Sequence, residues 1–371
     1  MFGSIWNKKK EIKAMETIPR IESQRKKNSS LLTRLRILNG PDMGIDLGTN
    51  NVKIYVKGKG IVLHEPAVVA YDELKRKIVQ VGTAAWAMQG RTPKHMKVIR
   101  PIRGGVIADY DATEYMVRYF IEKSLGKRYF LKPRIIVSTP AGITNVERRA
   151  VLEATIQAGS RKTVLIEQTL AAAIGCGIDQ AKANGSMVID IGGGTTDMAV
   201  LSLSGIVISE SLRIGGGYLD TAIIRYMKRR KKLLIGTRTA ESLKVSIGTV
   251  HKKGRDLSIP IKGRDTISGL PKSIVVESKD VAQAIADPID KIIRAIKSIL
   301  EKTPPELASD IADHGILLTG SGAKLHGLDR LITRETGIAA YICEDPVMSV
   351  ANGLGKAIGS LNELRDSLEE L

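Results

Sequence analysis

Cysteine, histidine and aromatic residues are all scarce in this chain of 371 residues. Its two cysteines, Cys176 and Cys343, have no CxxC partner, which excludes a disulfide scaffold and a zinc module and favours a reducing, cytoplasmic environment. The five histidines show no HExxH or other ligand spacing, so we expect no metal site built on histidine. No apolar run approaches the roughly 18 residues of a membrane-spanning helix, and the start lacks the apolar core of a secretory signal. We therefore expect neither an integral membrane protein nor a secreted one.

Acidic residues are outnumbered, because 57 lysines and arginines stand against 39 aspartates and glutamates, a net charge of +18. This excess indicates a polyanionic partner or surface, such as nucleic acid, anionic lipid or nucleotide phosphates. Aromatic residues make up only 4% of the chain, which weakens any interpretation based on base stacking. The sequence also lacks an RNP-like string, a zinc finger and a recognition helix. We expect no specific nucleic acid as a partner, and a basic nucleic-acid-binding protein is kept as an alternative.

Residues 1–42 differ from the rest, with many cations and no sustained apolar period. We expect a mostly disordered basic extension with a short amphipathic start. Phe2, Ile5 and Trp6 share one face of a helix for about two turns, which makes a short interfacial anchor. Each nearby cation adds about 1 kcal/mol at an anionic leaflet. The basic residues of this segment are Lys8, Lys9, Lys10, Lys13, Arg20, Arg25, Lys26, Lys27, Arg34 and Arg36.

A second apolar group, Tyr129, Phe130 and Leu131, lies in an expected loop with cations on both sides. Such a group suits contact with an anionic membrane surface. The alternative is that Phe130 and Leu131 pack into the core. The residues by themselves leave both possibilities open.

From Met43 onward, apolar runs alternate with glycine turns and helical patterns, which is typical of an α/β protein. Thr144 and Glu147 form a capping box, which explains Glu147 better than a catalytic role does. One helix should place Met116, Tyr119 and Phe120 on one side, and residues 251–277 look irregular. We expect strands at 43–46, 52–56, 64–70, 78–81, 135–139, 163–166, 187–190, 198–203 and 315–318. We expect helices at 112–123, 145–158, 170–174, 219–229, 239–247, 281–301 and 350–361.

One pattern occurs twice: an apolar strand ends in an aspartate and a glycine turn, and a second strand begins. The copies lie at 44–49 and 188–195, with Asp46 and Asp190 before the turns. Glycine turns expose backbone N–H groups that can bind phosphate oxygens, and two carboxylates beside a polyphosphate imply Mg²⁺ between them. The alternative is two ordinary hairpins. The pattern is neither a Walker loop nor a dinucleotide-binding turn, and it predicts two similar lobes around a shared nucleotide cleft.

Two further features could contact the nucleoside. Residues 320–323 form a glycine-rich turn after an apolar strand and could cover it. Glu241 and Lys244 lie one helical turn apart, which equally fits a solvated ion pair.

The order of these pieces resembles the actin/Hsp70/sugar-kinase ATPase superfamily and, within it, the MreB-type bacterial actins. The resemblance covers roughly 43–361, and its matching strings are 44–49, 56–62, 105–110, 146–150, 190–196, 238–241 and 301–307. It implies a bilobal actin-like α/β fold, with a smaller subdomain in each lobe. The first lobe would comprise 43–182 and 350–371, with its small subdomain at about 70–111. The second would comprise 183–349, with its small subdomain at about 219–281.

By this resemblance, ATP and Mg²⁺ are the cofactors, with Asp46 and Asp190 near the metal and with catalytic roles. Gln168 takes the place of the catalytic glutamate that the family usually carries. Glutamine can hold a water but cannot accept its proton, so the resemblance implies a slow ATPase at most. The implied nucleotide-binding residues are Gly48, Thr49, Asn50, Asn51, Gly192, Gly193, Gly194, Thr195, Glu241, Lys244, Gly320, Ser321, Gly322 and Ala323.

Two more positions depart from the family. Asp197 stands in place of the usual glutamate, and Ser321 in place of a glycine. Glu167, next to Gln168, is a doubtful substitute for the catalytic glutamate, because neighbours in a strand point to opposite faces.

The resemblance implies a cytoplasmic protein that polymerises with its own copies into filaments on the inner face of the membrane. MreB-type proteins reach the membrane through an N-terminal helix or a hydrophobic loop, and their implied partners are cell-wall elongation and shape-determining membrane proteins. A sugar-type kinase is the alternative, but we find no acceptor-site carboxylate. An Hsp70-type chaperone would need a further domain after the ATPase.

Overall fold

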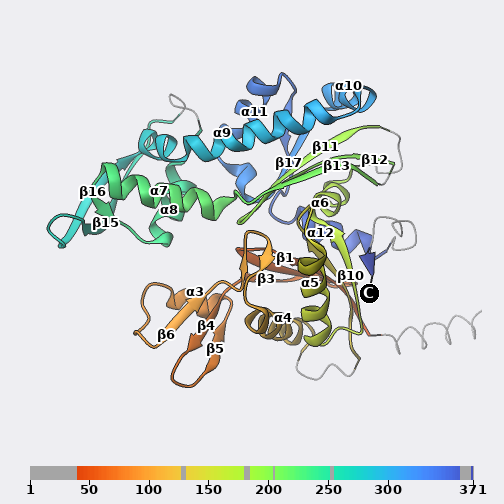
Figure 1. Ribbon diagram of the computed structural model, residues 1–371, viewed down its shortest axis with the longest axis horizontal. Coiled ribbons are helices and arrows are strands. Elements are labelled where there is room, and N and C mark those ends of the chain that lie inside the picture. The colour runs from red at the N-terminus through yellow and green to blue at the C-terminus, as the bar shows by residue number, and fades with distance from the viewer. Residues whose placement is uncertain are drawn as a thin grey trace, which may run out of the picture.

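The computed structural model describes residues 40–126, 131–178, 184–203, 205–250, 255–359 and 369–370. Two large sheets, one in each half of the molecule, lie on either side of a pair of central helices (Figure 1). We call the halves the first and second lobes. Within the described residues, no helix is both long and apolar enough to cross a bilayer.

The first lobe is built on a six-stranded sheet with the order β19-β10-β9-β1-β2-β3. Its strands are β1 (Asp42–Leu47), β2 (Asn51–Val56), β3 (Gly60–Pro66), β9 (Arg134–Thr139), β10 (Lys162–Glu167) and β19 (Glu369–Glu370). Its helices are α4 (Tyr110–Leu125), α5 (Asn145–Gln157), α6 (Gln168–Cys176) and α12 (Ser349–Ala357). A smaller part holds β4 (Val69–Asp72), β5 (Lys77–Val81), α3 (Thr83–Met88), β6 (Met96–Ile99), β7 (Ile102–Arg103) and β8 (Val106–Ile107).

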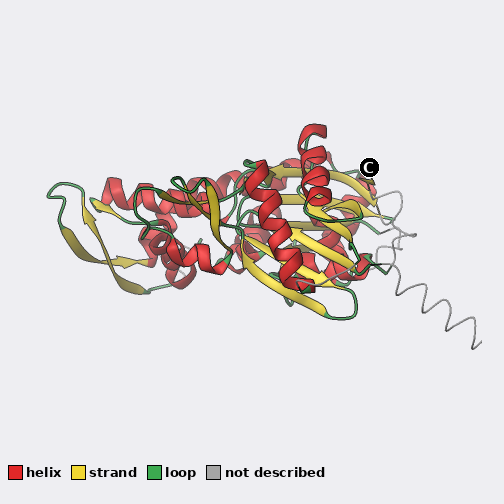
Figure 2. Cartoon of the chain, turned by 90° about the horizontal axis from the view of Figure 1, so that it is seen from below, coloured by secondary structure: helices red, strands yellow, loops and turns green. Residues whose placement is uncertain are grey.

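The second lobe is built on a five-stranded sheet with the order β13-β12-β11-β17-β18. Its strands are β11 (Ser186–Ile191), β12 (Thr196–Ser202), β13 (Gly205–Leu212), β17 (Ile316–Thr319) and β18 (Ala340–Ile342). Its helices are α7 (Gly216–Arg230), α8 (Thr237–Ile247), α9 (Ser278–Lys302), α10 (Pro305–His314), η1 (Ser321–Lys324) and α11 (Leu328–Thr336). A small sheet of β14 (Leu233–Leu234), β15 (Ser258–Asp265) and β16 (Pro271–Glu277) projects at one end (Figure 2).

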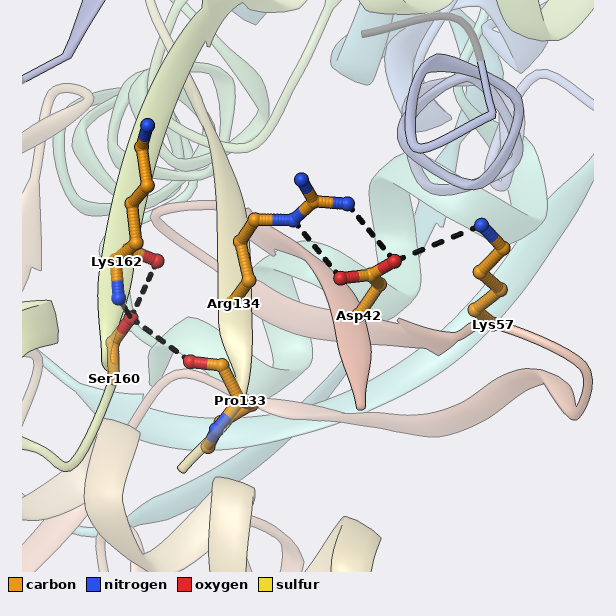
Figure 3. Close-up of polar contacts among 6 residues, drawn as sticks. All are labelled: Asp42, Lys57, Pro133, Arg134, Ser160 and Lys162. Carbon is orange, nitrogen blue, oxygen red and sulfur yellow. Dashed lines mark hydrogen bonds and ion pairs between the residues drawn. The ribbon is translucent and has the colours of Figure 1, made fainter. Parts of the chain in front are cut away.

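The repeated sequence pattern has the same topology in both lobes. β1 runs antiparallel to β2 and parallel to β9, and β11 runs antiparallel to β12 and parallel to β17. Each aspartate therefore lies near the end of a buried central strand, just before a tight turn. At the other end of β1, Arg134 Nε and Nη2 bind the two carboxylate oxygens of Asp42 at 2.9 Å each (Figure 3). This bidentate pair supports the β1–β9 register on which the position of Asp46 depends.

Four sequence predictions need correction. The expected strand at 64–70 is divided into β3 and β4 after Pro66, which has no N–H for a continuous ladder. Residues 251–277, expected to be irregular, contain the β15–β16 hairpin, because Ile261 and Val276 pack into the core of the second lobe. Tyr119 is 37% exposed, so it does not share the buried face of Met116 and Phe120. The last helix ends at Ala357, short of the expected position 361.

Other elements were not anticipated at all: β13, α10 and α11 are clear in the structure. Several predictions lie outside the described residues, namely the extension up to residue 39 with Phe2, Ile5 and Trp6, and also Tyr129 and Phe130. Leu131 is described and is 39% exposed. The predicted lobe and subdomain boundaries stay a prediction.

Candidate functional site

The two aspartate–glycine turns meet across a cleft between the lobes. A Cβ atom added to Gly194 would lie 2.2 Å from Thr49 Oγ1, and one added to Gly193 would lie 2.3 Å from the Asn50 side chain. Only glycine permits such an approach of the second turn to the first. The cleft is lined by Asp46, Gly48, Thr49, Asn50, Asn51, Lys53, Gly105, Gln168, Asp190, Gly192, Gly193, Gly194, Thr195, Gly320, Ser321, Pro346, Val347 and Val350.

Two buried carboxylates, Asp46 and Asp190, line this cleft. Asp46 and Asp190 are 4% and 5% exposed, and Asp197 is fully buried. Burial, followed by the negative charges of Asp197 and Asp46, raises the pKa of Asp190 to about 8. Burial also raises the pKa of Asp197, although Thr195 Oγ1 donates a 2.7 Å hydrogen bond to its carboxylate. The raised pKa means that Asp190 stays protonated at neutral pH unless a cation in the cleft stabilises its ionised form.

Lys53 is a cleft residue that the sequence pattern did not single out. Its Nζ lies 2.6 Å from Asp46 Oδ2, and its side chain is only 13% exposed. The signal was present in the strand alternation: Val52, Ile54 and Val56 are buried on one face of β2, while Lys53 pairs with Asp46 across the β1–β2 ladder. A lysine opposite an aspartate beside a glycine turn is a candidate ligand for a phosphate.

Gln168 lies in the cleft as the first residue of α6 and is 7% exposed. Its neighbour Glu167 is the N-cap residue of the helix and is not among the residues that line the cleft. Of the two residues, only Gln168 lines the cleft, and it does so as a helix residue and not as the strand neighbour that the sequence suggested. Holding a water near a terminal phosphate stays a predicted role of Gln168.

The expected nucleoside contacts are only partly brought together. Gly320 and Ser321 line the cleft, whereas the Ala323 side chain is buried in the core of the second lobe. Lys244 Nζ binds Asp220 Oδ1 at 2.7 Å and donates to the Gly216 carbonyl at 2.9 Å. The simple Glu241–Lys244 ion pair, weighed as the alternative, is therefore wrong.

Glu147 has the structural role that its spacing predicted. Both bonds of the capping box with Thr144 are present at the start of α5. The same carboxylate accepts a 3.0 Å bond from Arg213 Nη2 of the second lobe. Glu147 thus caps the start of α5 and also joins the lobes.

Comparison with known proteins decides the family. The MreB/Mbl protein family model matches residues 40–366. The chain belongs to the MreB/Mbl family. It is 47% identical to the cell shape-determining protein Mbl of Bacillus subtilis (strain 168), over 87% of this chain and 97% of the relative. It is 46% identical to the cell shape-determining protein MreB of Escherichia coli (strain K12), over 88% of this chain and 96% of that relative.

Solved structures of MreB-like proteins agree with this assignment. MreB5 of Spiroplasma citri bound to AMPPNP superposes with a TM-score of 0.84 at 32% identity, covering 88% of this chain and 98% of that one. The MamK double helical filament, at 20% identity, gives a TM-score of 0.73 and covers 86% of this chain and 99% of that one. At this identity it supports the actin-like fold alone. The actin-like ATPase fold expected from the sequence is confirmed.

This MreB/Mbl chain also has a cation–π contact between the lobes. The Arg100 and Arg238 guanidinium carbons lie 5.1 Å and 5.2 Å from the centre of the Trp86 ring. Trp86 belongs to α3 of the first lobe and Arg238 to α8 of the second. Arg100 also donates to the Thr49 carbonyl at 3.2 Å, so this contact is connected to the first phosphate turn.

We expect Arg238→Ala to release bound nucleotide about three to ten times faster, because an inter-lobe cation–π contact contributes about 0.5–2 kcal/mol. Chase experiments with a fluorescent ADP would measure the rate. Arg229→Ala, which removes an exposed arginine of α7, is the matched control. In a Trp6→Phe background, the emission of Trp86 should also change in Arg238→Ala. Unaltered emission and an unaltered release rate would together contradict this role.

Proposed function

We propose that this chain is an actin-like filament protein that binds ATP with Mg²⁺ between its lobes. The observation that carries the proposal is the contact of two aspartate–glycine turns, one from each lobe, beside buried carboxylates. The structural relatives in complex with AMPPNP and ADP support a nucleotide at this place. A triphosphate held by both turns would favour the closed arrangement of the lobes.

The donor set of the cleft fits a magnesium ion. Mg²⁺ prefers oxygen ligands and keeps several waters, so two carboxylates and the phosphate oxygens suffice. The raised pKa of Asp190 shows that this carboxylate is costly to ionise unless a cation is nearby. Asp46 and Asp190 would hold the ion, which when bound would neutralise charge on the phosphates. Among the described residues no group of three or more His, Cys, Asp or Glu side chains forms a metal site of its own, in keeping with an ion shared with the nucleotide.

The roles of the chain's own residues follow from their positions. The N–H groups of 48–51 and 192–195 would bind phosphate oxygens, and Lys53 would exchange its bond to Asp46 for one to a phosphate. Gln168 would orient the attacking water through hydrogen bonds and leave its proton to bulk water or a phosphate oxygen. Lys244, Glu241 and 320–323 would border the nucleoside. The result is slow hydrolysis coupled to lobe closure.

We propose further that the filaments lie on the inner face of the cell membrane and help to organise cell-wall synthesis. The names of the relatives, cell shape-determining proteins, support the cellular role. The cationic extension and its Phe2, Ile5 and Trp6 face support contact with anionic lipid. Leu131, which is exposed and follows Tyr129 and Phe130 in the sequence, supports a second contact. The cellular partners would be membrane proteins of wall elongation.

Sedimentation tests these proposals directly. The full chain should pellet with Mg-ATP, and in the presence of vesicles of anionic lipid it should pellet at lower protein concentration. Vesicles of neutral phosphatidylcholine are the matched control, because the attraction of about 1 kcal/mol that each cation contributes requires negatively charged lipid. Failure to pellet with Mg-ATP would contradict the filament proposal, and equal pelleting with both kinds of vesicle would contradict the lipid proposal.

A further inference from the structure

The fold joins the two cysteines of the chain, which are 167 residues apart in sequence. Cys176 and Cys343 form a disulfide whose Cα atoms are 6.2 Å apart, within the range that a disulfide spans. The sequence predicted two reduced thiols with no pairing, and the structure corrects this. Both residues are half-buried, so small thiol reagents can reach them.

The two cysteines lie where the chain passes between the lobes. Cys176 is the last residue of α6, after which the chain runs to β11 of the second lobe. Cys343 follows β18 of the second lobe, after which the chain runs to α12. The disulfide therefore ties the start of one inter-lobe connection to the start of the other.

The helices at the first-lobe ends of these connections, α6 and α12, pack together as one block. A Cβ atom on Gly353 of α12 would lie 1.7 Å from the Ala171 carbonyl oxygen of α6, and one on Gly175 would lie 1.9 Å from that of Ser349. Lys356 Nζ also donates to the Gly175 carbonyl at the end of α6 at 3.0 Å. With α6 and α12 in backbone contact, rotation of the second lobe has to occur in the connections that leave this block. The disulfide joins the start of one of these connections, 343–349, directly to the end of α6. It therefore restricts how far this connection can move.

We propose that Cys176 and Cys343 are a thiol–disulfide modification site that, when oxidised, holds the lobes in the closed arrangement. The cleft is closed in the structure that contains the bond, because the two glycine turns touch. Reduction would release the second lobe at this hinge and allow the cleft to open. The effect on nucleotide release rests on the proposed function, whereas the effect on the hinge does not.

The chemistry requires an oxidant of the low-molecular-weight disulfide class. The thiolate of one cysteine attacks a sulfur of that disulfide and expels one small thiol, and the second cysteine then attacks the mixed disulfide and expels the other. Two protein thiols are oxidised to one disulfide while one small disulfide is reduced to two thiols. In a reducing cytoplasm such a bond is transient, which suits a redox-sensing role.

The experiment uses the full chain after treatment with oxidised glutathione or with a phosphine reductant. Maleimide labelling under denaturing conditions counts free thiols, and we expect two after reduction and none after oxidation. Hydrogen exchange without nucleotide should then be about tenfold slower at the amides of 343–349 in the oxidised chain. Release of a fluorescent ADP should be about fivefold slower.

Cys176→Ser with Cys343→Ser, treated identically, is the matched control and should show no response to oxidant. Each single variant can only form a mixed disulfide with glutathione, so its hinge exchange should stay that of the reduced chain under both treatments. Two thiols after oxidation, or identical hinge exchange in the two redox states, would overturn the proposal. If hinge exchange slows on oxidation but no nucleotide binds, the disulfide still restrains the hinge and only the proposed function fails. If nucleotide binds but is released at the same rate in both redox states, the proposed function stands and the control of the cleft by the disulfide fails.

Discussion

Asp190→Asn will bind Mg-ATP at least about 30-fold more weakly than the wild-type chain, yet without nucleotide it will unfold at a higher temperature. The loss of affinity follows from removing one of two anionic groups beside the metal, because truncating one partner of a buried charge pair costs about 2–5 kcal/mol. The gain in stability follows from burial, which makes the ionised Asp190 costly in the folded state. A neutral amide of the same shape avoids that cost.

The same residue predicts how stability depends on pH. The pKa of Asp190 is about 8 in the folded protein, whereas in the unfolded chain it takes the ordinary value of 3.8. Between these two pH values the folded state binds the proton and the unfolded state does not. The contribution of Asp190 is fully present below pH 4 and is lost as pH rises through about 8. The stability advantage of Asp190→Asn should therefore grow from pH 4 to pH 8 and then stay constant.

Thermal unfolding of the nucleotide-free proteins at several pH values measures this advantage, which should reach about 2 °C or more at pH 8. Asp287→Asn, which changes an exposed aspartate of α9, is the matched control and should show no such trend. Calorimetric titration with Mg-ATP measures the affinity. An Asp190→Asn protein that binds as tightly as wild type would remove this carboxylate from the proposed site.

Gln168→Ala will release phosphate about tenfold more slowly than wild type, and Gln168→Glu several-fold faster. The buried amide can only orient the attacking water, whereas a carboxylate at the same place can also accept its proton, a contribution of about 10²–10⁴ in favourable sites. The alanine variant loses the orienting amide and gains no proton acceptor. Gln168 is the first residue of α6, and glutamate and alanine are both good helix formers, so neither replacement should disturb the helix.

Phosphate release should be measured at saturating Mg-ATP, so that altered binding does not enter. Gln157→Glu and Gln157→Ala, at the exposed end of α5, are the matched controls. Equal rates for wild type and both Gln168 variants would show that this residue has no part in hydrolysis. A loss of nucleotide affinity in Gln168→Ala, with an unchanged rate at saturation, would indicate a binding role instead.

The turns were predictable because their chemistry is local. Asp46 with Gly48 and Asp190 with Gly192 are each close in sequence, and the glycine requirement follows from backbone conformation. The capping box of Thr144 and Glu147 was predictable for the same reason. In each case the interacting groups lie within a few residues of each other, so the order of residue types is enough to predict the local geometry.

Lys53, by contrast, required the ladder register, since its partner Asp46 lies on another strand. The β15–β16 hairpin was missed because its alternation of buried and exposed residues is interrupted by Pro260 and Pro271, and packing of Ile261 and Val276 overrides these local preferences. The pairing of Lys244 with Asp220 depends on how α7 and α8 pack together. Each of these contacts depends on strand register or on packing, which a local pattern does not determine by itself.

The sequence by itself determined the family and the two aspartate–glycine turns, because each resides in a short string with a distinctive order of side-chain types. The binding of phosphate by these turns and the role of Gln168 stay predictions. Only the tertiary structure decided that the turns touch across the cleft, that Trp86 is stacked between arginines of both lobes, and that Cys176 meets Cys343. These contacts join residues tens to hundreds of positions apart. Their existence depends on how two sheets pack against α6 and α12, which no local pattern specifies.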